Sequence, residues 1–421
     1  MTASPNQTLG FIFTTFPPEV SGSALYNWQR IQWLAQQGCY RVIALVPDWG
    51  TEASLPTVPP KLQETLILEP YPSRPWPIYQ LLRSPQWKAA DYMRDRLAYY
   101  QPDIITVVDV ERLFWFGVWH LPGVKYARTN KIPYLSEYHT DYYNHVSTYR
   151  GGRLIQKIIK PLTCLLYHSC SQTLAISDTA QLSLQQLGVN NSIMLPMYGL
   201  DLAEFSPDKR DHQYLHSWLS KTEHSHQVVL FMGRLAMEKR LDWLIQAFAL
   251  VKKQYPQCSL FIAGDGPQDV VTQLKKMARS VPHIHFLGFI QGDAKAKLLA
   301  SCDVYCSPAP YETFGRTPIE AMASGIPIIT INRGGVTTYI RHGINGYLVA
   351  PDDIQGLSEA LMKVLITPNP ALIKQAQSDA NQYSLEQRCQ NLHKYYQQIL
   401  SSNFSSTRDR ETLETQEELS S

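Results

Sequence analysis

The sequence predicts an α/β protein made of two doubly wound, Rossmann-like domains, each with a parallel sheet covered by helices on both faces. Short, continuously apolar segments alternate with segments of helical periodicity, beginning at residues 9–16, 24–37 and 41–46. This alternation is typical of parallel sheets that are buried on both faces. It starts again at residue 226, after a polar segment that contains several histidines. The 421 residues are enough for two or three domains of ordinary size.

The predicted boundaries follow from these two series of strands and helices. The first domain spans residues 1–205, residues 206–226 form a linker without apolar periodicity, and the second domain spans residues 227–383. Further strands are predicted at residues 103–110, 132–139, 172–177, 192–196, 226–235, 258–267, 284–290, 302–308 and 326–332, and further helices at 89–100, 241–254 and 270–279. A last helix is predicted over residues 384–400, and residues 401–421, which lack apolar periodicity, are predicted to be disordered.

The composition excludes several classes of protein. Lys and Arg number 38 and Asp and Glu number 36, and this balance argues against a dedicated nucleic-acid-binding protein. No run of about 18 apolar residues is present, as a membrane-spanning helix would need, and the first residues do not resemble a secretory signal. The seven cysteines have neither zinc-ribbon nor disulfide-framework spacing. We therefore expect a cytosolic protein whose thiols are free and buried.

The most specific motif is YETFGRTPIEAMASGIP at residues 311–327, which follows a predicted strand. Its loop carries Glu312 and leads into a predicted helix, so backbone N–H groups near Phe314 would point at an anion such as a phosphate. Glu312 and Glu320 are spaced to hold one polyhydroxylated ligand from the loop and from the helix. However, Thr317-x-x-Glu320 is also a capping box. From the residues alone, Glu320 could either bind a ligand or stabilise the helix.

Two further motifs follow predicted strands of the second domain. In GRLAMEK at residues 233–239, Gly233 allows a ligand to approach the backbone, and Arg234 and Lys239 could clamp a diphosphate. They could equally be surface charges at the end of a strand. The sequence GDGP at residues 264–267 is by itself only a turn.

Together these motifs resemble those of the retaining glycosyltransferases of family 4, which have the GT-B fold. Glu312 and Glu320 match the family's E-x7-E motif, residues 233–239 its G-R-L-x-x-E-K motif and residues 264–267 its G-D-G-P turn. The resemblance extends to about residue 400, with a departure at Tyr198, where the family has asparagine. It implies an enzyme that transfers a sugar from a nucleotide-diphosphate sugar, expected to be a UDP-sugar, to a hydroxyl group with retention of the anomeric configuration.

The resemblance also implies roles for the residues of these motifs. Arg234 and Lys239 would neutralise the diphosphate, Glu320 would bind the ribose, and Glu312 would hold hydroxyls of the transferred sugar. The donor-binding residues implied in this way are Gly22, Gly233, Arg234, Lys239, Glu312, Phe314, Gly315, Arg316, Thr317 and Glu320. An inactive nucleotide-sugar-binding module would be expected to have lost one of the two cations or glutamates, and all four are present.

The first domain contributes fewer candidates. Gly22, at the end of PPEVSG, would bring backbone close to the phosphates, and a nucleotide-binding oxidoreductase would need G-x-G-x-x-G there instead. His139 aligns with the family's histidine that faces the sugar near the reacting carbon. The expected catalytic residues are therefore His139, Arg234, Lys239 and Glu312.

No metal and no other cofactor is expected, because cationic side chains and a helix N-terminus can stabilise a leaving diphosphate. Asp109 and Glu111 are superficially similar to a metal-binding D-x-D motif. They follow a predicted strand of the first domain, and contact with the acceptor or a role in loop structure is the preferred interpretation.

A basic and an apolar face adjoin on the helix predicted near residue 150. Arg150, Arg153, Lys157 and Lys160 fall on one helical face, and leucines and isoleucines between residues 154 and 166 cover the adjoining one. Such a helix suits an anionic membrane surface, although a core helix with a solvated basic edge has the same pattern.

The preceding segment, HTDYY at residues 139–143, points to the acceptor. With Asp141 at its centre, it resembles the acceptor region of glycerolipid glycosyltransferases such as sulfolipid and digalactolipid synthases. The resemblance implies a glycerolipid acceptor, either diacylglycerol or monoglycosyl-diacylglycerol, and a peripheral location on the cytoplasmic face of a membrane. A soluble saccharide or polysaccharide precursor is the alternative acceptor, and no nucleic-acid partner is expected.

Overall fold

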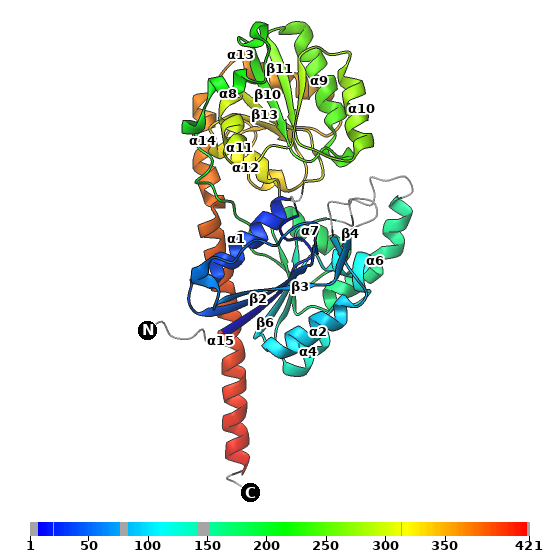
Figure 1. Ribbon diagram of the computed structural model, residues 1–421, viewed down its shortest axis with the longest axis vertical. Coiled ribbons are helices and arrows are strands. Elements are labelled where there is room, and N and C mark those ends of the chain that lie inside the picture. Colours follow the sequence, from blue (N-terminus) through cyan, green and yellow to red (C-terminus); the bar gives the residue numbers. More distant parts are fainter. Residues whose placement is uncertain are drawn as a thin grey trace. The chain divides into compact units, whose positions relative to one another are not determined.

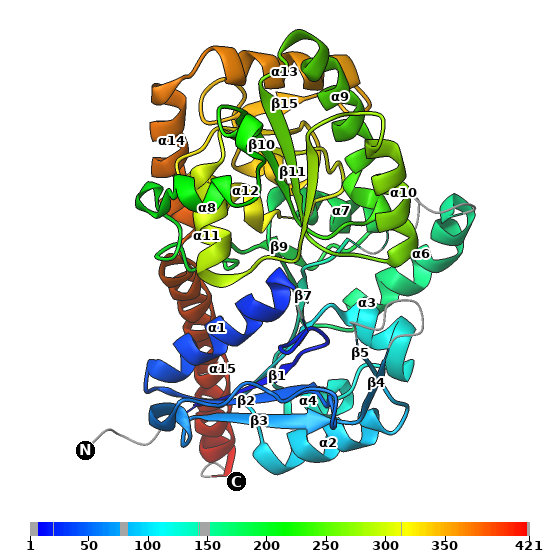
Figure 2. The same cartoon turned by 45° about the horizontal axis from the view of Figure 1, so that its top comes forward.

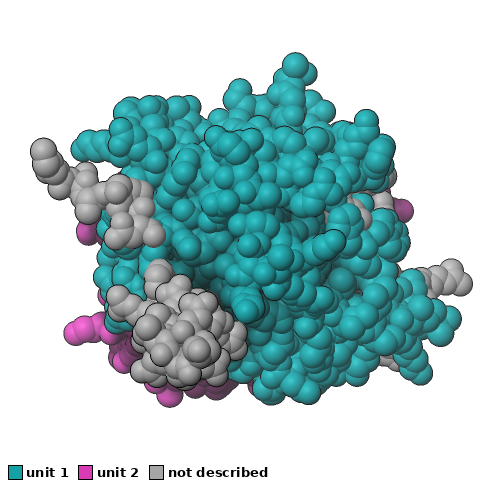
Figure 3. Space-filling view, turned by 90° about the horizontal axis from the view of Figure 1, so that it is seen from below, with its two compact units in different colours: residues 1–143, 153–199, 385–421 teal, residues 144–152, 200–384 magenta. Residues whose placement is uncertain are grey.

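The chain folds into two compact units in the computed structural model, which describes residues 7–19, 21–75, 83–141, 143, 152–312 and 314–418. Unit 1 comprises residues 1–143, 153–199 and 385–421, and unit 2 comprises residues 144–152 and 200–384 (Figure 3). Each unit therefore contains segments that are distant in the sequence, and each is described by itself below.

Unit 1 is built on a parallel sheet, seven-stranded within the described residues, with the order β3-β2-β1-β6-β7-β8-β9 (Figure 1). Its strands are β3 (Leu66–Tyr71), β2 (Tyr40–Pro47), β1 (Gln7–Ile12), β6 (Ile104–Val108), β7 (Tyr134–Tyr138), β8 (Gln172–Ala175) and β9 (Ser192–Met194). A short antiparallel pair, β4 (Ser73–Pro75) with β5 (Arg83–Pro85), lies outside this sheet. The central strands are buried along nearly their whole length, as the continuous apolar segments predicted.

The helices of unit 1 pack in pairs beside the sheet. They are α1 (Gly22–Gln36), α2 (Ala89–Tyr100), α3 (Val110–Leu113), α4 (Val124–Asn130), α6 (Gly152–His168), α7 (Asp178–Leu187) and α15 (Leu385–Glu418). Helix α1 packs against α15, and α2 packs against α4. The N-terminus of α1 is fixed by Ser21, whose Oγ accepts the backbone N–H of Ala24 at 3.1 Å.

Unit 2 is built on a second parallel sheet, six-stranded within the described residues, with the order β12-β11-β10-β13-β14-β15 (Figure 2). Its strands are β10 (Gln227–Met232), β11 (Cys258–Ala263), β12 (Ile284–Gly288), β13 (Val304–Ser307), β14 (Ile328–Ile331) and β15 (Tyr347–Val349). Its helices are α8 (His212–His216), α9 (Leu241–Gln254), α10 (Gln268–Ala278), α11 (Gly292–Ser301), α12 (Arg316–Ala323), α13 (Ile354–Ile366) and α14 (Pro370–Ala380). One buried hydrophobic cluster joins α9, α10 and α13 to the strands. The prediction of two parallel-sheet α/β domains is thus confirmed.

Residues 206–226, predicted to be a linker, are folded as part of unit 2. The segment contains α8 and two short 3-10 helices, and Leu215 and Leu219 are buried. Arg210 Nε donates to the carbonyl of Ala300 at 2.9 Å, and the backbone N–H of Asp211 donates to Ser301 Oγ at 2.8 Å. The linker prediction failed because two buried leucines among polar residues are too few to give a visible apolar period.

The C-terminal segment also differs from its prediction. Helix α15 buries Cys389, Leu392, Tyr396 and Leu400 in unit 1, and the backbone is helical to Glu418, although residues 401–421 were predicted to be disordered. In the sequence, the apolar periodicity ends at Leu400, where the helix was predicted to end. Apolar periodicity reports which residues are buried, whereas a helix without Pro or Gly can continue beyond its buried stripe.

Two properties of the whole chain bear on its environment. All seven cysteines are free, and five of them are buried. Among the helices of the described residues, none combines the length and the apolar character that crossing a membrane requires.

Candidate active site

Three loops of unit 2 leave the same edge of its sheet. Strand β10 pairs in parallel with β11 and with β13. Residues 233–239 follow β10, residues 264–267 follow β11, and the loop that carries Glu312 follows β13. Because parallel strands have their carboxyl ends at one edge, all three sequence motifs meet at this edge.

Glycines allow the first two of these loops to pack backbone against backbone. Gly264 has a φ of +144°, and a Cβ on it would lie 1.8 Å from the carbonyl oxygen of Gly233. A Cβ on Gly266 would lie 1.9 Å from the carbonyl oxygen of Leu235. The backbone N–H of Leu235 donates to the carbonyl of Asp265 at 2.9 Å. The G-D-G-P turn therefore shapes the loop that carries the two cations.

The structure brings Lys239 and Glu312 together. Lys239 Nζ lies 2.5 Å from Glu312 Oε2, and both side chains are only partly exposed. The carbonyl of Glu312 accepts the backbone N–H of Gly335 at 2.5 Å. Gly334 has a φ of +80°, and a Cβ on it would lie 2.6 Å from that same carbonyl oxygen. The backbone of Glu312 is thus held from a neighbouring loop, and its carboxylate is oriented by a cation.

Arg234 is directed differently from Lys239. Its Nη2 lies 2.6 Å from Glu238 Oε1 within the same loop, and its side chain is 45% exposed. The two residues predicted to clamp a diphosphate are therefore on one loop, and each is paired with a different glutamate.

Glu320 does not form the capping box that its spacing allowed. Helix α12 begins at Arg316, two residues earlier than the box requires, and its N-cap is Gly315, with a φ of +81° and no side-chain cap. Glu320 is buried within the helix, and its Oε2 lies 2.5 Å from Lys295 Nζ. Arg316 Nε is 3.8 Å from its other carboxylate oxygen. The buried carboxylate is thus compensated by cations, which leaves ligand binding or ion pairing as its roles.

Buried tyrosines support the loop before α12. Tyr339 donates its hydroxyl to the carbonyl of Gly315 at 2.7 Å, and its ring packs on Phe314 with 5.9 Å between centroids. Burial raises the pKa of Tyr339 well above its ordinary value, and the negative charges of Glu312 and Glu320 raise it further. The hydroxyl therefore stays protonated and keeps donating to the loop.

In unit 1, His139 lies directly after β7 in a buried charged network. Its Nε2 is 2.9 Å from Glu137 Oε2, and the other Glu137 oxygen accepts from Arg30 Nη1 at 2.7 Å. All three side chains are fully buried. Burial alone would raise the pKa of Glu137, but Arg30 and His139 outweigh it and lower the pKa to about 2. Glu137 is therefore ionised, and it fixes the orientation of His139.

Aromatic rings enclose this network. The His139 ring packs edge-on against Tyr198 at 5.4 Å and beside Tyr26 at 6.0 Å. The guanidinium of Arg30 lies over the Tyr26 ring at 5.0 Å from its centroid. Tyr198, where the chain departs from the family pattern, thus contributes directly to the surroundings of His139.

Asp109 and Glu111 have separate structural partners. The Asp109 carboxylate accepts backbone N–H groups from His139 at 3.1 Å and Thr140 at 3.0 Å. Glu111 accepts the Tyr167 hydroxyl at 2.8 Å, and burial raises the pKa of Glu111 well above its ordinary value. Glu111 is thus bound to a tyrosine hydroxyl, and Asp109 shapes the loop that carries His139.

The loop before α1 is anchored by a buried ion pair. Gly22 is exposed at the first position of α1. Three residues earlier, Glu19 Oε2 lies 2.8 Å from Arg112 Nη2, and Arg112 also donates to Thr15 Oγ1 at 2.5 Å. The sequence analysis missed Glu19 and Arg112, as it missed Arg30 and Glu137. For Arg30, Arg112 and Glu137, the available signal was a charged residue inside an apolar strand or helix, but this signal does not identify the partner.

The described part of the candidate acceptor side lies mainly on α6. Arg150 lies outside the described residues, as does the side chain of Arg153, and Lys157 and Lys160 are exposed. Leu154, Ile158 and Leu165 are 66%, 67% and 62% exposed. A core helix would bury these side chains, whereas here they are exposed. Asp141 Oδ2 accepts the Ser183 hydroxyl at 3.1 Å.

Two family models match the two halves of the chain. Residues 20–195 match the model described as Glycosyltransferase Family 4, and residues 218–383 match that described as Glycosyl transferases group 1. The chain therefore belongs to the glycosyltransferases that these two models describe together.

This glycosyltransferase has curated relatives with different activities. It is 28% identical to sulfoquinovosyl transferase SQD2 of Arabidopsis thaliana, over 64% of the chain and 51% of the relative. It is 26% identical to the alpha-monoglucosyldiacylglycerol synthase of Streptococcus pneumoniae, over 72% of the chain and 68% of the relative. It is 27% identical to a GDP-mannose-dependent alpha-mannosyltransferase of Mycolicibacterium smegmatis, over 84% of the chain and 86% of the relative. The match to the Arabidopsis protein thus spans only about half of that protein.

Solved structures show that the glycosyltransferase has the GT-B fold. HepE of Anabaena in complex with UDP-glucose superposes with a TM-score of 0.69 at 21% identity, covering 95% of this chain and 100% of the other. Sucrose-phosphate synthase of Thermosynechococcus elongatus superposes with a TM-score of 0.75 at 17% identity, covering 94% and 100%.

Proposed function

We propose that this glycosyltransferase moves a sugar, with retention of the anomeric configuration, from a nucleotide-diphosphate sugar to a hydroxyl of a membrane glycerolipid. A UDP-sugar is the proposed donor, and diacylglycerol or monoglycosyl-diacylglycerol is the proposed acceptor. The pairing of Lys239 with Glu312 carries the donor half of the proposal, because it places a cation for phosphate beside a carboxylate for sugar hydroxyls.

The proposed reaction needs charge stabilisation more than a nucleophile. The bond between the anomeric carbon and the diphosphate oxygen breaks, and a bond between that carbon and the acceptor oxygen forms on the same face. The acceptor proton passes to a phosphate oxygen of the leaving group. Arg234 and Lys239 would stabilise the charge that develops on the diphosphate, and we propose no metal for this step. Glu320 would hold the ribose.

His139 would face the transferred sugar, the role that the family resemblance implies. The burial of His139 and its contact with ionised Glu137 support a fixed imidazole orientation, which a group near a reacting carbon requires.

The acceptor half of the proposal rests on α6. Its exposed apolar side chains adjoin the exposed Lys157 and Lys160, which is the arrangement of a helix lying in the interface of an anionic membrane. Two relatives, named as a sulfoquinovosyl transferase and an alpha-monoglucosyldiacylglycerol synthase, give further support. We accordingly propose a peripheral location on the cytoplasmic face of a membrane.

A soluble saccharide acceptor is the second candidate. The relatives also include a mannosyltransferase and a glycogen synthase, and the motifs of unit 2 would serve either acceptor. Exposed apolar residues on α6 favour the lipid, because a soluble saccharide gives no reason to expose them.

Transfer assays with a panel of nucleotide-sugars, with and without diacylglycerol or monoglycosyl-diacylglycerol, would identify donor and acceptor. Lys239→Ala and Arg234→Ala should each lower turnover at least about a hundredfold, since each removes a cation from the leaving group. Both variants should keep the wild-type far-UV circular dichroism spectrum. Near-normal turnover in both would contradict the donor-site assignment.

Sedimentation with vesicles would test the membrane role of α6. Replacing Arg150, Arg153, Lys157 and Lys160 with Gln should release the protein from anionic vesicles, because each cation near such a surface contributes about 1 kcal/mol. The matched control replaces the exposed Lys275 and Lys276 of α10 with Gln. If the wild type binds neutral and anionic vesicles equally, or neither, the soluble-saccharide acceptor becomes the better candidate.

A further inference from the structure

A cluster of imidazoles surrounds one carboxylate at the edge of unit 2 opposite the donor loops. Glu223 ends a short 3-10 helix (Lys221–Glu223), His226 immediately precedes β10, and His283 immediately precedes β12. The amino ends of these parallel strands lie at the edge opposite the loops that carry Lys239 and Glu312. The cluster therefore belongs to no part of the candidate active site.

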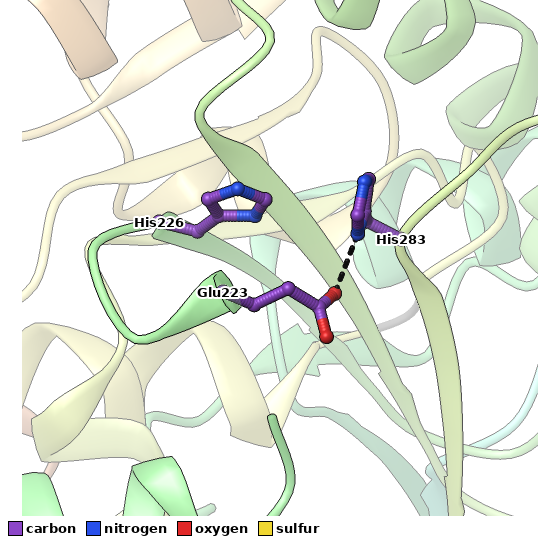
Figure 4. A group of neighbouring side chains, drawn as sticks. All are labelled: Glu223, His226 and His283. Atoms are coloured by element: carbon purple, nitrogen blue, oxygen red, sulfur yellow. Dashed lines mark hydrogen bonds and ion pairs between the residues drawn. The ribbon is translucent and has the colours of Figure 1, made fainter. Parts of the chain in front are cut away.

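The side chains of the cluster converge on one point. Figure 4 shows the His226 and His283 rings on two sides of the Glu223 carboxylate. His283 Nδ1 lies 2.7 Å from Glu223 Oε1, and one ligand atom from each of the three residues lies within 4.8 Å of the others. His285 Nε2 lies 2.8 Å from the same Glu223 oxygen.

Glu223 is held rigidly by its own segment. Its Oε2 accepts the backbone N–H of Ser220 at 3.0 Å and the Ser220 hydroxyl at 2.5 Å. Burial would raise the pKa of Glu223, but these hydrogen bonds, followed by those of His283 and His285, outweigh it and lower the pKa well below its usual range. With Oε2 occupied by Ser220, Oε1 is the oxygen that faces the imidazoles.

A hydrogen bond orients the imidazole of His226. Its Nδ1 lies 2.9 Å from Ser259 Oγ, which orients the ring. Hydrogen-bonded orientation of this kind is usual for histidines that ligate metals.

We propose that Glu223, His226 and His283 form a binding site for a divalent transition-metal ion, with Zn²⁺ as the best match. Two imidazoles and a carboxylate are typical zinc ligands, at about 2.0–2.2 Å from the ion. Ligand atoms around one tetrahedral ion at that distance lie roughly 3.4 Å apart. The atoms of the cluster would therefore need side-chain movements on the order of 1 Å. Water or His285 would complete the coordination.

The proposed ion would have a structural role. It would join the segment of residues 206–226 to β12, since His283 lies 60 positions after Glu223 in the sequence. A metal that binds only the folded unit stabilises that unit by mass action.

Metal binding should be measured on the full-length protein, purified without a polyhistidine tag and freed of metal with a chelator. Isothermal titration with ZnCl₂ should give one site with a Kd below about 10 µM, and saturating Zn²⁺ should raise the Tm by about 5 °C. His226→Ala and His283→Ala should each weaken binding by about tenfold or more.

His216→Ala is the matched control, because it removes an imidazole from the same segment but outside the ligand set. It should bind Zn²⁺ as the wild type does. A wild type without a stoichiometric site, or cluster variants that bind as well as the wild type, would overturn the proposal. Should the alanine variants fail to fold, Co²⁺ titration of the wild type decides. The intense visible absorption of tetrahedral Co²⁺ is expected, and its absence would overturn the proposal.

Discussion

Removing the charge of Glu137 should destabilise unit 1 strongly. Glu137 and Arg30 form a fully buried ion pair at 2.7 Å. The variant Glu137→Gln keeps the size of the side chain but leaves the Arg30 guanidinium and its surroundings without a compensating charge. Breaking one partner of a buried pair typically costs about 3–5 kcal/mol.

The lowered pKa of Glu137 gives a second value for the stability that its charge contributes. Folding lowers the pKa of Glu137 from 4.5 to about 2, which corresponds to roughly 3 kcal/mol of stability at neutral pH. Because the pKa is lower in the folded state, this contribution is complete above about pH 4.5. It is lost as the pH falls from there toward 2, where the folded protein also takes up the proton.

Differential scanning calorimetry and urea unfolding at pH 7 would measure the change. We expect Glu137→Gln to lose about 3 kcal/mol and to lack the acid-dependent loss between pH 4.5 and 2. The control Asp91→Asn breaks an exposed pair with Arg94 and should cost about 1 kcal/mol or less. A double variant, Arg30→Met with Glu137→Leu, should recover much of the lost stability, because it removes both charges. A loss below about 1 kcal/mol in Glu137→Gln would refute the reasoning.

Three further predictions concern Glu320, Gly264 and the metal requirement of the reaction. Glu320→Gln should weaken nucleotide binding by about tenfold or more, measured by calorimetric titration. It should also lower the Tm by a few degrees, because Lys295 loses its partner. Unchanged affinity would leave Glu320 as an ion-pair partner only. Gly264→Ala should lower the Tm much more than Gly288→Ala. A Cβ on Gly264 would clash with the Gly233 backbone, whereas Gly288, also at positive φ, has open space around it. Equal Tm values would contradict the close approach of Gly264 to Gly233. Sugar transfer should persist in EDTA, and a loss restored by Mg²⁺ or Mn²⁺ would instead require a metal in the transfer reaction.

The fold and the donor motifs were predictable because their signals are local. The parallel sheets follow from continuous apolar segments, and α2 and α9 begin and end where their periodicity does. Glu312 and Glu320 lie in one loop and the helix that follows it, as their spacing predicted. Their binding of a single ligand stays a prediction.

Only the tertiary structure decided which charged groups meet. Arg30 and Glu137 are 107 residues apart, and Lys239 and Glu312 are 73 apart. Local patterns cannot specify such pairs, because the partners are brought together by the order of strands in the sheet. The sequence also left open whether Glu320 caps α12 or binds a ligand. The structure excludes the capping box, because α12 begins at Arg316.

The two errors at segment boundaries have a common physical reason. Residues 206–226 lack a visible apolar period but fold onto unit 2 through buried leucines and backbone hydrogen bonds. Helix α15 continues beyond Leu400, where the apolar periodicity of the sequence ends. The sequence by itself determined where apolar surface recurs, and hence the two sheets and their helices. Hydrogen bonds and ion pairs between distant segments, which need no apolar period, were decided by the tertiary structure.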